Sequence, residues 1–436
     1  MKKGMFFWML ALMICAAGCA DSFTEEPQLP TQEASHEVTQ AEARQSLEKI
    51  VFDLKIPSTR GGEQKRMPPI TSVYSTGRAA EATRSGEEIE PYFHIFNFGR
   101  DEGFAIMSGD DRVEPLLALT FKGEFTPETE IDNPGFEIAY SRMEDYYVHR
   151  VATYSPDDAR VGILPDSMPG KDQIGFREGE PFNVYYEMPL GHCPVKWGQT
   201  DPYNMFCYAY DEEPAYTGCV ATAVAQLMSI YKYPSSYNGY TFDWEEMNMY
   251  TDNNTPELLN LHILGVRHIA LLMQQIGLSH NLDVDYGAVI DSIGSSAPTA
   301  NIPRTLENFG YINGGSNVPY NTDAVAAELK AGYPILISGD NQYDIGHQWL
   351  SHGIMERKTP IYSYDCLTGE FIGTTYQTST YILCNMGWDG DKDGYYLSLY
   401  FDANNGPDFE QNTTRSVMAQ DKNYRYDIDV VKGIRR

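Results

Sequence analysis

The chain has 436 residues, 42% of them hydrophobic and 13% aromatic, which supplies enough apolar side chains for sizeable cores and excludes wholesale disorder. Its 32 Lys and Arg residues stand against 61 Asp and Glu residues, so the net charge is −29. Nucleic-acid binding, which needs a basic surface, is therefore excluded. At roughly 100–200 residues per domain, this length predicts two domains.

Residues 1–19 indicate an export signal. MKKG is basic, and FFWMLALMICAA is apolar but too short for a comfortable membrane span. The segment ends in Ala16-Ala17-Gly18-Cys19, which resembles the lipobox of bacterial lipoproteins. That resemblance implies cleavage before Cys19 and a lipid anchor of several acyl chains on it. An ordinary signal peptide with a chance cysteine is the alternative. Ala20, where aspartate would signal inner-membrane retention, favours the outer membrane or cell surface.

Residues 20–36 are polar and contain two prolines, which predicts a tether. Residues 37–153 predict a small α+β domain. In chain order we expect a helix within 37–58, a mobile loop at 59–90, a β-hairpin of 92–98 and 103–109, an apolar strand within 108–125 and a helix within 131–154.

Residues 154–183 are rich in Pro, Gly, Asp and Ser, which predicts a linker. Residues 184–436 predict a larger domain in which helices precede strands, so its class is α+β. The expected helices are 219–233, 256–277 and 322–331, and the expected strands lie within 333–339, 346–356, 374–388 and 393–401.

Cys219 stands at the start of an alanine-rich apolar helix, directly after Gly218. A helix N-terminus stabilises a thiolate, and glycine at the preceding position lets a substrate chain approach closely. The alternative is an inert core cysteine, because a helix that is apolar nearly all round is buried.

A thiolate nucleophile needs a basic partner within hydrogen-bond reach. Among nine histidines, His347 follows a glycine and opens an apolar strand. His352 is the rival, but its odd offset on the same strand turns it to the opposite face. Asn385 can supply an amide that orients the imidazole, and Gln199 an amide for the oxyanion.

Four motifs together resemble the streptopain family, a bacterial branch of the papain-like cysteine peptidases. They are W-G-Q-x-x-P-Y-N at 197–204, T-G-C-V-A-T-A-x-A-Q-x-M at 217–228, G-H-x-W at 346–349 and N-M-G-W at 385–388. The segment GFAIMSGDDRVEPLLALTFKGEF, in the first domain, resembles the propeptide of that family. The likeness extends from about residue 91 to about residue 400.

The resemblance implies a papain-like fold, with a helical part and an antiparallel β-sheet part, preceded by an α+β propeptide domain. It implies that Cys219 is the nucleophile, His347 the general acid/base and Gln199 the oxyanion donor. Asn385, Trp349 and Trp388 would set the histidine, and Gly218 would border the substrate groove. Neither a metal nor an organic cofactor is implied.

Two departures from the family pattern stand near these motifs. Met386 occupies the position of the first tryptophan of N-W-G-W, and His352-Gly353 replaces an Asp-Gly pair. They leave open a catalytically impaired surface lipoprotein that binds peptides or inhibits a peptidase. Another thiol-acyl reaction, such as amidase or transglutaminase chemistry, is a further alternative.

The same likeness implies a zymogen whose own propeptide is its inhibitor and whose substrates are proteins or peptides. A cut within 154–183 would release the propeptide, either by self-processing or by an outside protease at Arg160 or Lys171. With a lipid on Cys19, that cut would also free the catalytic domain from the membrane.

Two further patterns concern calcium binding and disulfide bonds. Asp389 to Gly394 matches the first half of a calcium-binding EF-hand loop, but Tyr400 stands where the loop needs glutamate, so a solvated turn is favoured. Without Cys15 and Cys19, five of the seven cysteines remain, an odd number that leaves at least one thiol unpaired. Cys193 could bridge Cys207, and Cys366 could bridge Cys384, but free thiols are equally expected.

Overall fold

The computed structural model describes residues 36–52, 54, 69–77, 91–154, 174–210, 212–250, 263–291, 294–340, 346–365, 367–402 and 428–436. The predictions for the export signal, the lipid on Cys19, most of the tether, residues 155–173 of the linker and Cys366 lie outside these residues. Within the described ranges, no helix combines the length and the apolar character that crossing a membrane requires.

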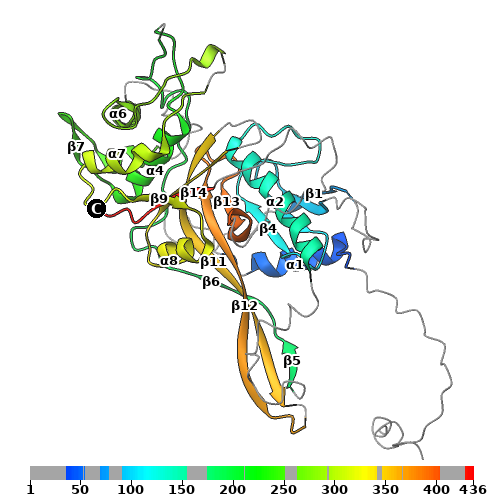
Figure 1. Ribbon diagram of the computed structural model, residues 1–436. Helices are drawn as coiled ribbons and strands as arrows, with labels where there is room; N and C mark the ends of the chain where they lie inside the picture. Colours follow the sequence, from blue (N-terminus) through cyan, green and yellow to red (C-terminus); the bar gives the residue numbers. More distant parts are fainter. Residues whose placement is uncertain are drawn as a thin grey trace, which may run out of the picture. The chain divides into compact units, whose positions relative to one another are not determined.

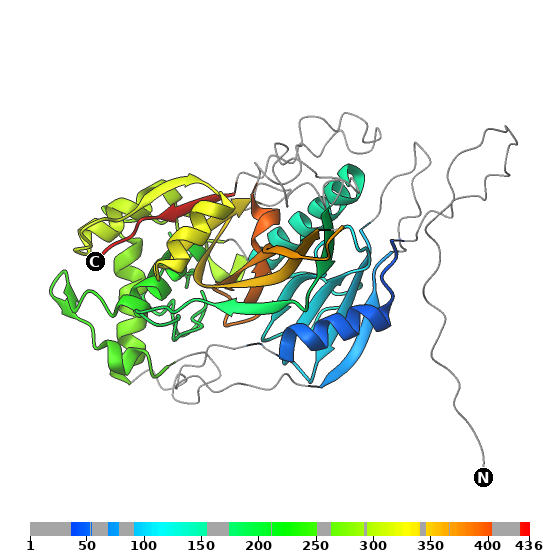
Figure 2. The same cartoon turned by 90° about the horizontal axis from the view of Figure 1, so that it is seen from below.

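Residues 36–154 form a four-stranded antiparallel sheet with a helix on each face (Figure 2). Its elements are α1 (Gln40–Phe52), β1 (Ile70–Ser75), β2 (Phe93–Phe98), β3 (Phe104–Ser108), β4 (Leu116–Thr120) and α2 (Pro134–Thr153). Every residue of β2, β3 and β4 is buried, because α1 and α2 cover the two faces. The predicted helices, hairpin and apolar strand are confirmed. The loop predicted at 59–90 is wrong in part, because β1 is a half-exposed edge strand with a weak apolar pattern.

The start of α2 is fixed by its own sequence. The Asn133 side chain accepts a hydrogen bond from the Phe136 backbone N–H at 3.1 Å, and Pro134 occupies the first helical turn. Gly135, the second residue of the helix, is buried. The first residue of α2 is therefore set by its own sequence.

Residues 174–436 contain the predicted helices followed by strands. The helices are α4 (Cys219–Tyr231), α5 (Trp244–Met247), α6 (Leu264–Gly277), α7 (Ile302–Asn308) and α8 (Thr322–Lys330). The strands are β5 (Ile174–Glu178), β6 (Phe182–Tyr185), β7 (Ser236–Tyr237), β8 (Tyr240–Thr241), β9 (Ser316–Pro319), β10 (Ile335–Asp340), β11 (Gly346–Asp365), β12 (Phe371–Asn385), β13 (Gly394–Leu397) and β14 (Asp429–Lys432). The last predicted strand is too long, because Ser398–Phe401 is a 3-10 helix, η5.

A single antiparallel sheet joins the two parts of the chain, in the order β1-β2-β3-β4-β13-β12-β11-β10-β14-β9 (Figure 1). The join is the pairing of β4 with β13, in which Leu119 faces Tyr395. Residues 36–436 accordingly form one compact unit. Sequence patterns locate strands but not their distant pairing partners, so the pairing of β4 with β13 was not predicted.

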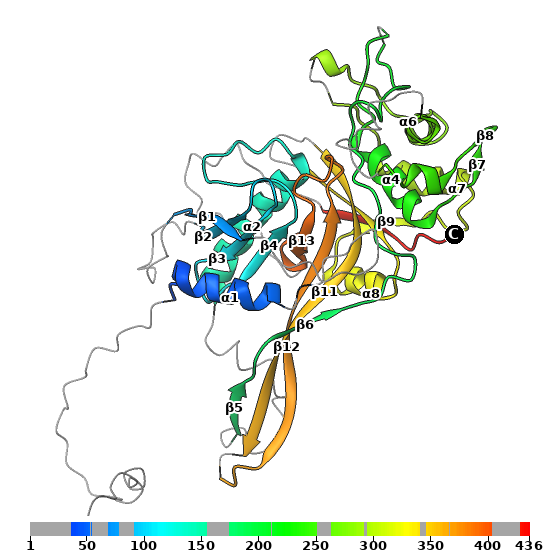
Figure 3. The ribbon, with the colours of Figure 1, turned by 180° about the vertical axis from the view of Figure 1, so that it is seen from behind.

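The outer halves of β11 and β12 leave the body as a long hairpin, shown in yellow and orange in Figure 3. β5 and β6 pair with the other edge of β11. The linker predicted at 154–183 is therefore wrong for β5 and for the start of β6. No residue of these two strands is buried, so their sequences show little apolar alternation.

At β11, the two faces of the sheet border two different hydrophobic cores. Trp349 belongs to the core that contains α2, whereas its neighbour Leu350 belongs to the core that contains α4. This is the alternation expected of a strand, whose successive side chains point to opposite faces. The two faces of β11 thus meet the N-terminal part and the Cys219 helix respectively.

Candidate active site

The thiol of Cys219 lies at the leading end of a buried helix, as predicted. Every residue of α4 from Val220 to Tyr231 is buried, while Cys219 itself is partly exposed. Gly218 has φ +86°, a conformation that favours glycine, and a β-carbon there would lie 3.3 Å from the Ser295 carbonyl oxygen. Glycine is therefore required at the position that precedes the thiol.

Burial and backbone hydrogen bonds act in opposite directions on the thiol. Burial raises the pKa of the Cys219 thiol, whereas the N–H groups of Gln348, Val220 and Cys219 itself favour the thiolate and lower it. Gln348 follows His347 on β11, so the sulfur lies against the strand that carries the predicted base.

Gln199 lies beside the turn that leads into α4. Its backbone carbonyl accepts a hydrogen bond from the Thr217 N–H at 3.0 Å. The same segment is fastened to α4 because the Gln226 side chain donates to the Trp197 carbonyl at 2.7 Å. The structure thus brings together Gln199 and Cys219, which the sequence separates by twenty residues.

His347 is buried, with 3% of its surface exposed. Its Nε2 atom donates to the Met386 carbonyl at 2.8 Å, because a carbonyl can only accept. Burial lowers the pKa of His347 to about 4, and the Met386 carbonyl opposes that shift. The imidazole is therefore neutral at physiological pH, with its proton on Nε2.

Both predicted tryptophans flank the imidazole. Trp349 stacks on it, with ring centroids 6.3 Å apart and planes at 15°. Trp388 meets it edge-on, with centroids 6.2 Å apart. Because Trp349 lies in the α2 core, the imidazole points to the same face, away from the core of α4. Accordingly, the hydrogen bonds described for His347 and Cys219 run to other partners and not to each other.

The start of α2 covers this imidazole. A β-carbon built on Gly135 would lie 2.9 Å from the His347 Cδ2 atom and 3.0 Å from the Met386 sulfur. Only glycine fits at such a distance. The N-terminal part therefore holds His347 in its buried position by direct contact. No sequence motif marks Gly135, so its contact with His347 is visible only in the fold.

The expected contact between Asn385 and His347 is replaced in the structure. The Asn385 amide nitrogen donates to the Val195 carbonyl at 2.8 Å, and its oxygen accepts from the Gly387 N–H at 3.1 Å. Asn385 pairs with Leu350 on β11 and shares its face of the sheet. The imidazole lies on the other face, where the Met386 carbonyl is its acceptor.

The rival histidine has a structural setting. The His352 Nδ1 atom accepts from the Cys193 N–H at 3.1 Å, and the His352 carbonyl accepts from His192 at 3.0 Å. Burial lowers the pKa of His352 well below its ordinary value. Cys193 and Cys207 are free thiols, as is Cys384, so the possible Cys193–Cys207 bridge is not formed.

The carboxylates of the candidate calcium loop point to different partners. Asp391 pairs with Lys392 at 3.0 Å, and Asp393 accepts from the Met386 N–H at 2.7 Å. Asp389 lies against Gly198, where a β-carbon would come within 2.5 Å of its oxygen. Within the described residues, no three His, Cys, Asp or Glu side chains are grouped to hold a metal ion.

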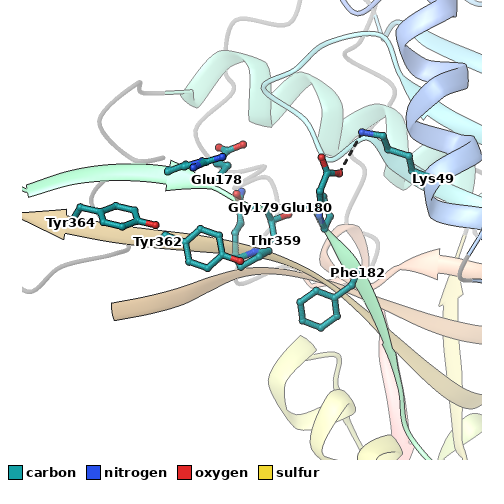
Figure 4. A pocket seen from close by; sticks show the side chains of 12 residues that line it. Lys49, Glu178, Gly179, Glu180, Phe182, Thr359, Tyr362 and Tyr364 are labelled. Atoms are coloured by element: carbon teal, nitrogen blue, oxygen red, sulfur yellow. Dashed lines mark hydrogen bonds and ion pairs between the residues drawn. The ribbon is translucent and has the colours of Figure 1, made fainter. Parts of the chain in front are cut away.

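A hollow lies between the β5–β6 turn, the β11 hairpin and α1 (Figure 4). Tyr362 and Tyr364 of β11 line it, and Lys49 of α1 faces Glu180 across it at 3.5 Å. None of the predicted catalytic residues lines this hollow. It marks a second contact of the N-terminal part with the catalytic part.

Comparisons with known proteins agree with this geometry. Residues 197–396 match the Peptidase C10 family, and residues 19–146 match the Spi protease inhibitor family. These matches support a streptopain-like cysteine peptidase that is preceded by a Spi-type inhibitor segment. It is 25% identical over 382 residues to Streptopain of Streptococcus pyogenes serotype M1, covering 77% of this chain and 84% of that protein. The Spi-type segment includes Gly135, and the peptidase segment includes Cys219, His347 and Asn385.

Two other similarities are partial. The chain is 24% identical over 393 residues to Thiol protease/hemagglutinin PrtT of Porphyromonas gingivalis, but it spans only 40% of that protein. Among solved structures, prointerpain A of Prevotella intermedia is 20% identical, with a TM-score of 0.48, and covers 84% of this chain and 99% of that one. Active interpain A is 21% identical, with a TM-score of 0.36, and covers 56% of this chain and 94% of that one.

Proposed function

We propose that the protein is an exported cysteine endopeptidase made as a zymogen. The observation that carries the proposal is the position of Cys219 at the start of α4. Its sulfur lies against Gln348 of β11, and the neighbouring residue of that strand, His347, is covered by the N-terminal helix α2. A Spi-type segment ahead of a C10 segment supports intramolecular inhibition. Residues 37–153 would be the propeptide and residues 184–436 the peptidase.

Activation in this proposal brings the imidazole within hydrogen-bond reach of the thiol, while the Met386 carbonyl stays the acceptor of the Nε2 proton. The Gly135 contact blocks that movement for as long as α2 is docked. Once α2 leaves, His347 is no longer covered, and its pKa rises as its burial is relieved. A thiolate–imidazolium pair then becomes available at neutral pH.

The reaction then follows from the residues. The Cys219 sulfur adds to the peptide carbonyl, and the Cys219 N–H with the Gln199 amide donates to the oxyanion. His347 passes its proton to the amine as the carbon–nitrogen bond breaks, which leaves a thioester. The neutral imidazole next takes a proton from a water molecule, whose oxygen adds to the thioester carbonyl. The carbon–sulfur bond then breaks, which releases the acid product and restores the Cys219 thiolate.

The decisive experiment compares the intact masses of wild-type protein and the Cys219→Ala variant, both lacking residues 1–19, before and after an epoxide thiol inhibitor. We expect the wild type to be trimmed within 154–183 and to carry one adduct, and the variant to stay full length and unlabelled. An unlabelled wild type, even after digestion by an outside protease that cuts at Arg160 or Lys171, would favour the impaired binding lipoprotein. A peptide-hydrolysis assay separates amidase or transglutaminase chemistry.

Anchoring at the outer membrane or cell surface through a lipid on Cys19 is the second part of the proposal. It rests on the lipobox-like sequence alone. Growth with a labelled fatty acid should label the protein, and Cys19→Ala should abolish the label. Label on the propeptide fragment alone after maturation would mean that cleavage frees the peptidase.

A further inference from the structure

We propose that Asp393 is a positioning residue for the His347 imidazole, acting through the backbone of Met386. The inference rests on the proposed peptidase function. It assigns a role in the reaction to a residue outside the nucleophile, the base, the oxyanion donor and the asparagine.

Two hydrogen bonds connect the carboxylate to the imidazole. The Asp393 Oδ1 atom accepts from the Met386 N–H at 2.7 Å, and the Met386 carbonyl accepts from His347 Nε2 at 2.8 Å. Asp393 therefore fixes one peptide group of Met386, and His347 is held by the next. Since Asn385 is engaged with Val195, this carbonyl is the acceptor that sets the ring direction and leaves the proton on Nε2.

The connection is local to the catalytic part of the chain. Asp393 precedes β13 and Met386 follows β12, and these strands are neighbours in the sheet. Cys384 on β12 pairs with Gly394 on β13, which keeps the ends of the turn together. Both hydrogen bonds therefore lie within the catalytic part, although the Asp393 carbonyl also accepts from the Phe121 N–H of the N-terminal part at 2.9 Å.

The setting of Asp393 is unusual for a residue with only a structural task. Asp393 is 7% exposed, and a serine or an asparagine could accept from Met386 without placing a charge there. Burial raises the pKa of Asp393 to about 7, so its charge changes near neutral pH. A charged Asp393 would stabilise an imidazolium at His347 and so raise the pKa of His347.

Several titratable groups face this carboxylate from the surrounding elements. Lys196 and Lys122 lower its pKa, and Asp391 raises it. Cys193, Cys384 and Tyr396 interact with it electrostatically as well, through the effect of Asp393 on their own pKa values. Lys122 belongs to the N-terminal part, so release of that part removes one of the two cations.

The test uses the mature enzyme with three single variants. Asp393→Asn keeps the size and an oxygen acceptor but removes the charge, and Asp393→Ala removes both. Asp391→Asn is the matched control, because Asp391 lies in the same turn and pairs with Lys392 in place of Met386. For each, kcat and KM are measured across the pH range, with active sites counted by the epoxide inhibitor.

We expect Asp393→Asn to lower kcat about tenfold at nearly unchanged KM and to move the limb of the pH profile that reports His347 to lower pH. Asp393→Ala should lose more. Asp391→Asn, which keeps the Asp393–Met386 hydrogen bond, should keep the wild-type kcat. Wild-type kcat and wild-type pH limbs in Asp393→Asn would overturn the proposal.

A second measurement separates this inference from the proposed function and from misfolding. In the full-length Cys219→Ala chain, nitrogen NMR of the His347 ring reports the tautomer and the pKa without any catalysis. Asp393→Asn should change one or both, and Asp391→Asn, which keeps the Asp393–Met386 hydrogen bond, should leave the tautomer unchanged. Identical ring signals in all three chains would overturn the positioning role even if the wild-type enzyme is active. An inactive wild type with a shifted ring would instead contradict only the peptidase proposal.

Discussion

Gly135 of α2 lies directly on His347, so close that a β-carbon at Gly135 would come within 2.9 Å of the imidazole. One glycine of the N-terminal part and the predicted base of the catalytic part thus share a single packed contact. The predicted inhibitor therefore contacts the catalytic part at the predicted base.

Replacing this glycine should loosen the inhibited state. Gly135→Ala forces the His347 ring or the helix to shift, at a cost of about 1–3 kcal/mol. We expect the Cys219→Ala chain to unfold at lower temperature with this change, and the active chain to mature faster. Gly294→Ala is the matched control, because no atom lies within 4 Å of a β-carbon there. Equal unfolding temperatures in both variants would contradict the contact.

Acid should destabilise the folded zymogen through its buried histidines. Burial lowers the pKa of His94, His192, His347 and His352 in the fold, so the unfolded chain binds more protons once the pH falls below the ordinary histidine value of about 6.5. Their effect on stability is absent above that pH and grows as the pH falls toward the folded pKa values. Denaturant unfolding of Cys219→Ala should therefore show a lower midpoint at about pH 5 than at about pH 7.

His94 offers a check inside the N-terminal part. Its ring bonds the Val38 carbonyl at 2.7 Å and the Ser75 hydroxyl at 2.8 Å, which fastens α1 and β1 to β2. His94→Gln should lower stability at every pH but make the acid dependence shallower, by up to about 1.4 kcal/mol per pH unit. An unchanged slope would mean that His94 is protonated in the fold.

Asp393 should have the opposite pH dependence. Burial raises its pKa to about 7, so the folded chain binds the extra proton, and the stabilising effect is lost as the pH rises toward that value. Asp393→Asn should therefore gain stability relative to the wild type between about pH 5 and about pH 8. A constant difference over that range would show that the carboxylate is already ionised at pH 5.

A second anchor of the N-terminal part lies at the far end of α1. The Asn183 amide donates to the Ile50 carbonyl at 2.9 Å, and Arg357 donates to the Asn183 oxygen at 3.0 Å. Asn183→Ala removes the buried hydrogen bonds to the Ile50 carbonyl and to Arg357, so the cleaved propeptide should dissociate faster from the catalytic part. Gel filtration after limited cleavage of the linker measures this.

Lys49→Ala is the control for that anchor. Lys49 also joins α1 to the β5–β6 turn, but its ion pair with Glu180 is 3.5 Å long and both side chains are exposed. Such a pair contributes about 0–1 kcal/mol. Dissociation as fast in Lys49→Ala as in Asn183→Ala would assign the anchor to charge and not to the buried hydrogen bonds.

Gln199 should contribute to the rate and little to the fold. Removing an oxyanion donor costs about 10²–10³ in kcat, and we expect Gln199→Ala to lose activity on that scale while still reacting with the epoxide. His352→Asn should affect stability more than kcat, because His352 caps the Cys193 N–H on the other face of β11. Equal losses of kcat in both variants would contradict these assignments.

Local sequence patterns predicted most of the helices and strands. The apolar run after Cys219 and the alternation of the 92–109 hairpin specify their structures within a few residues. The motifs also predicted roles for Cys219, His347 and the two tryptophans, and the structure places these side chains at or beside β11.

Relations between distant residues were not predictable in the same way. The Asn385 amide faces Val195 because Asn385 is in register with Leu350, and register depends on the whole sheet. Gly135 and Asp393 act through neighbours that only the fold supplies. β5 and β1 were missed because exposed edge strands bury too little surface to carry an apolar pattern.

The pairing of β4 with β13 has a consequence for how the molecule is built. The strands of residues 70–120 are synthesised long before β13. The N-terminal sheet can therefore form first, with β4 as an unpaired edge strand. Closing the contact between residues 119 and 395 is then the slow, long-range step, and the early sheet supplies a template for it. Once the linker is cut and the N-terminal part dissociates, β13 loses its pairing with β4 and becomes an edge strand of the remaining sheet. A mature enzyme of this design would hold its shape by a slow rate of unfolding, and it would not readily regain that shape after denaturation.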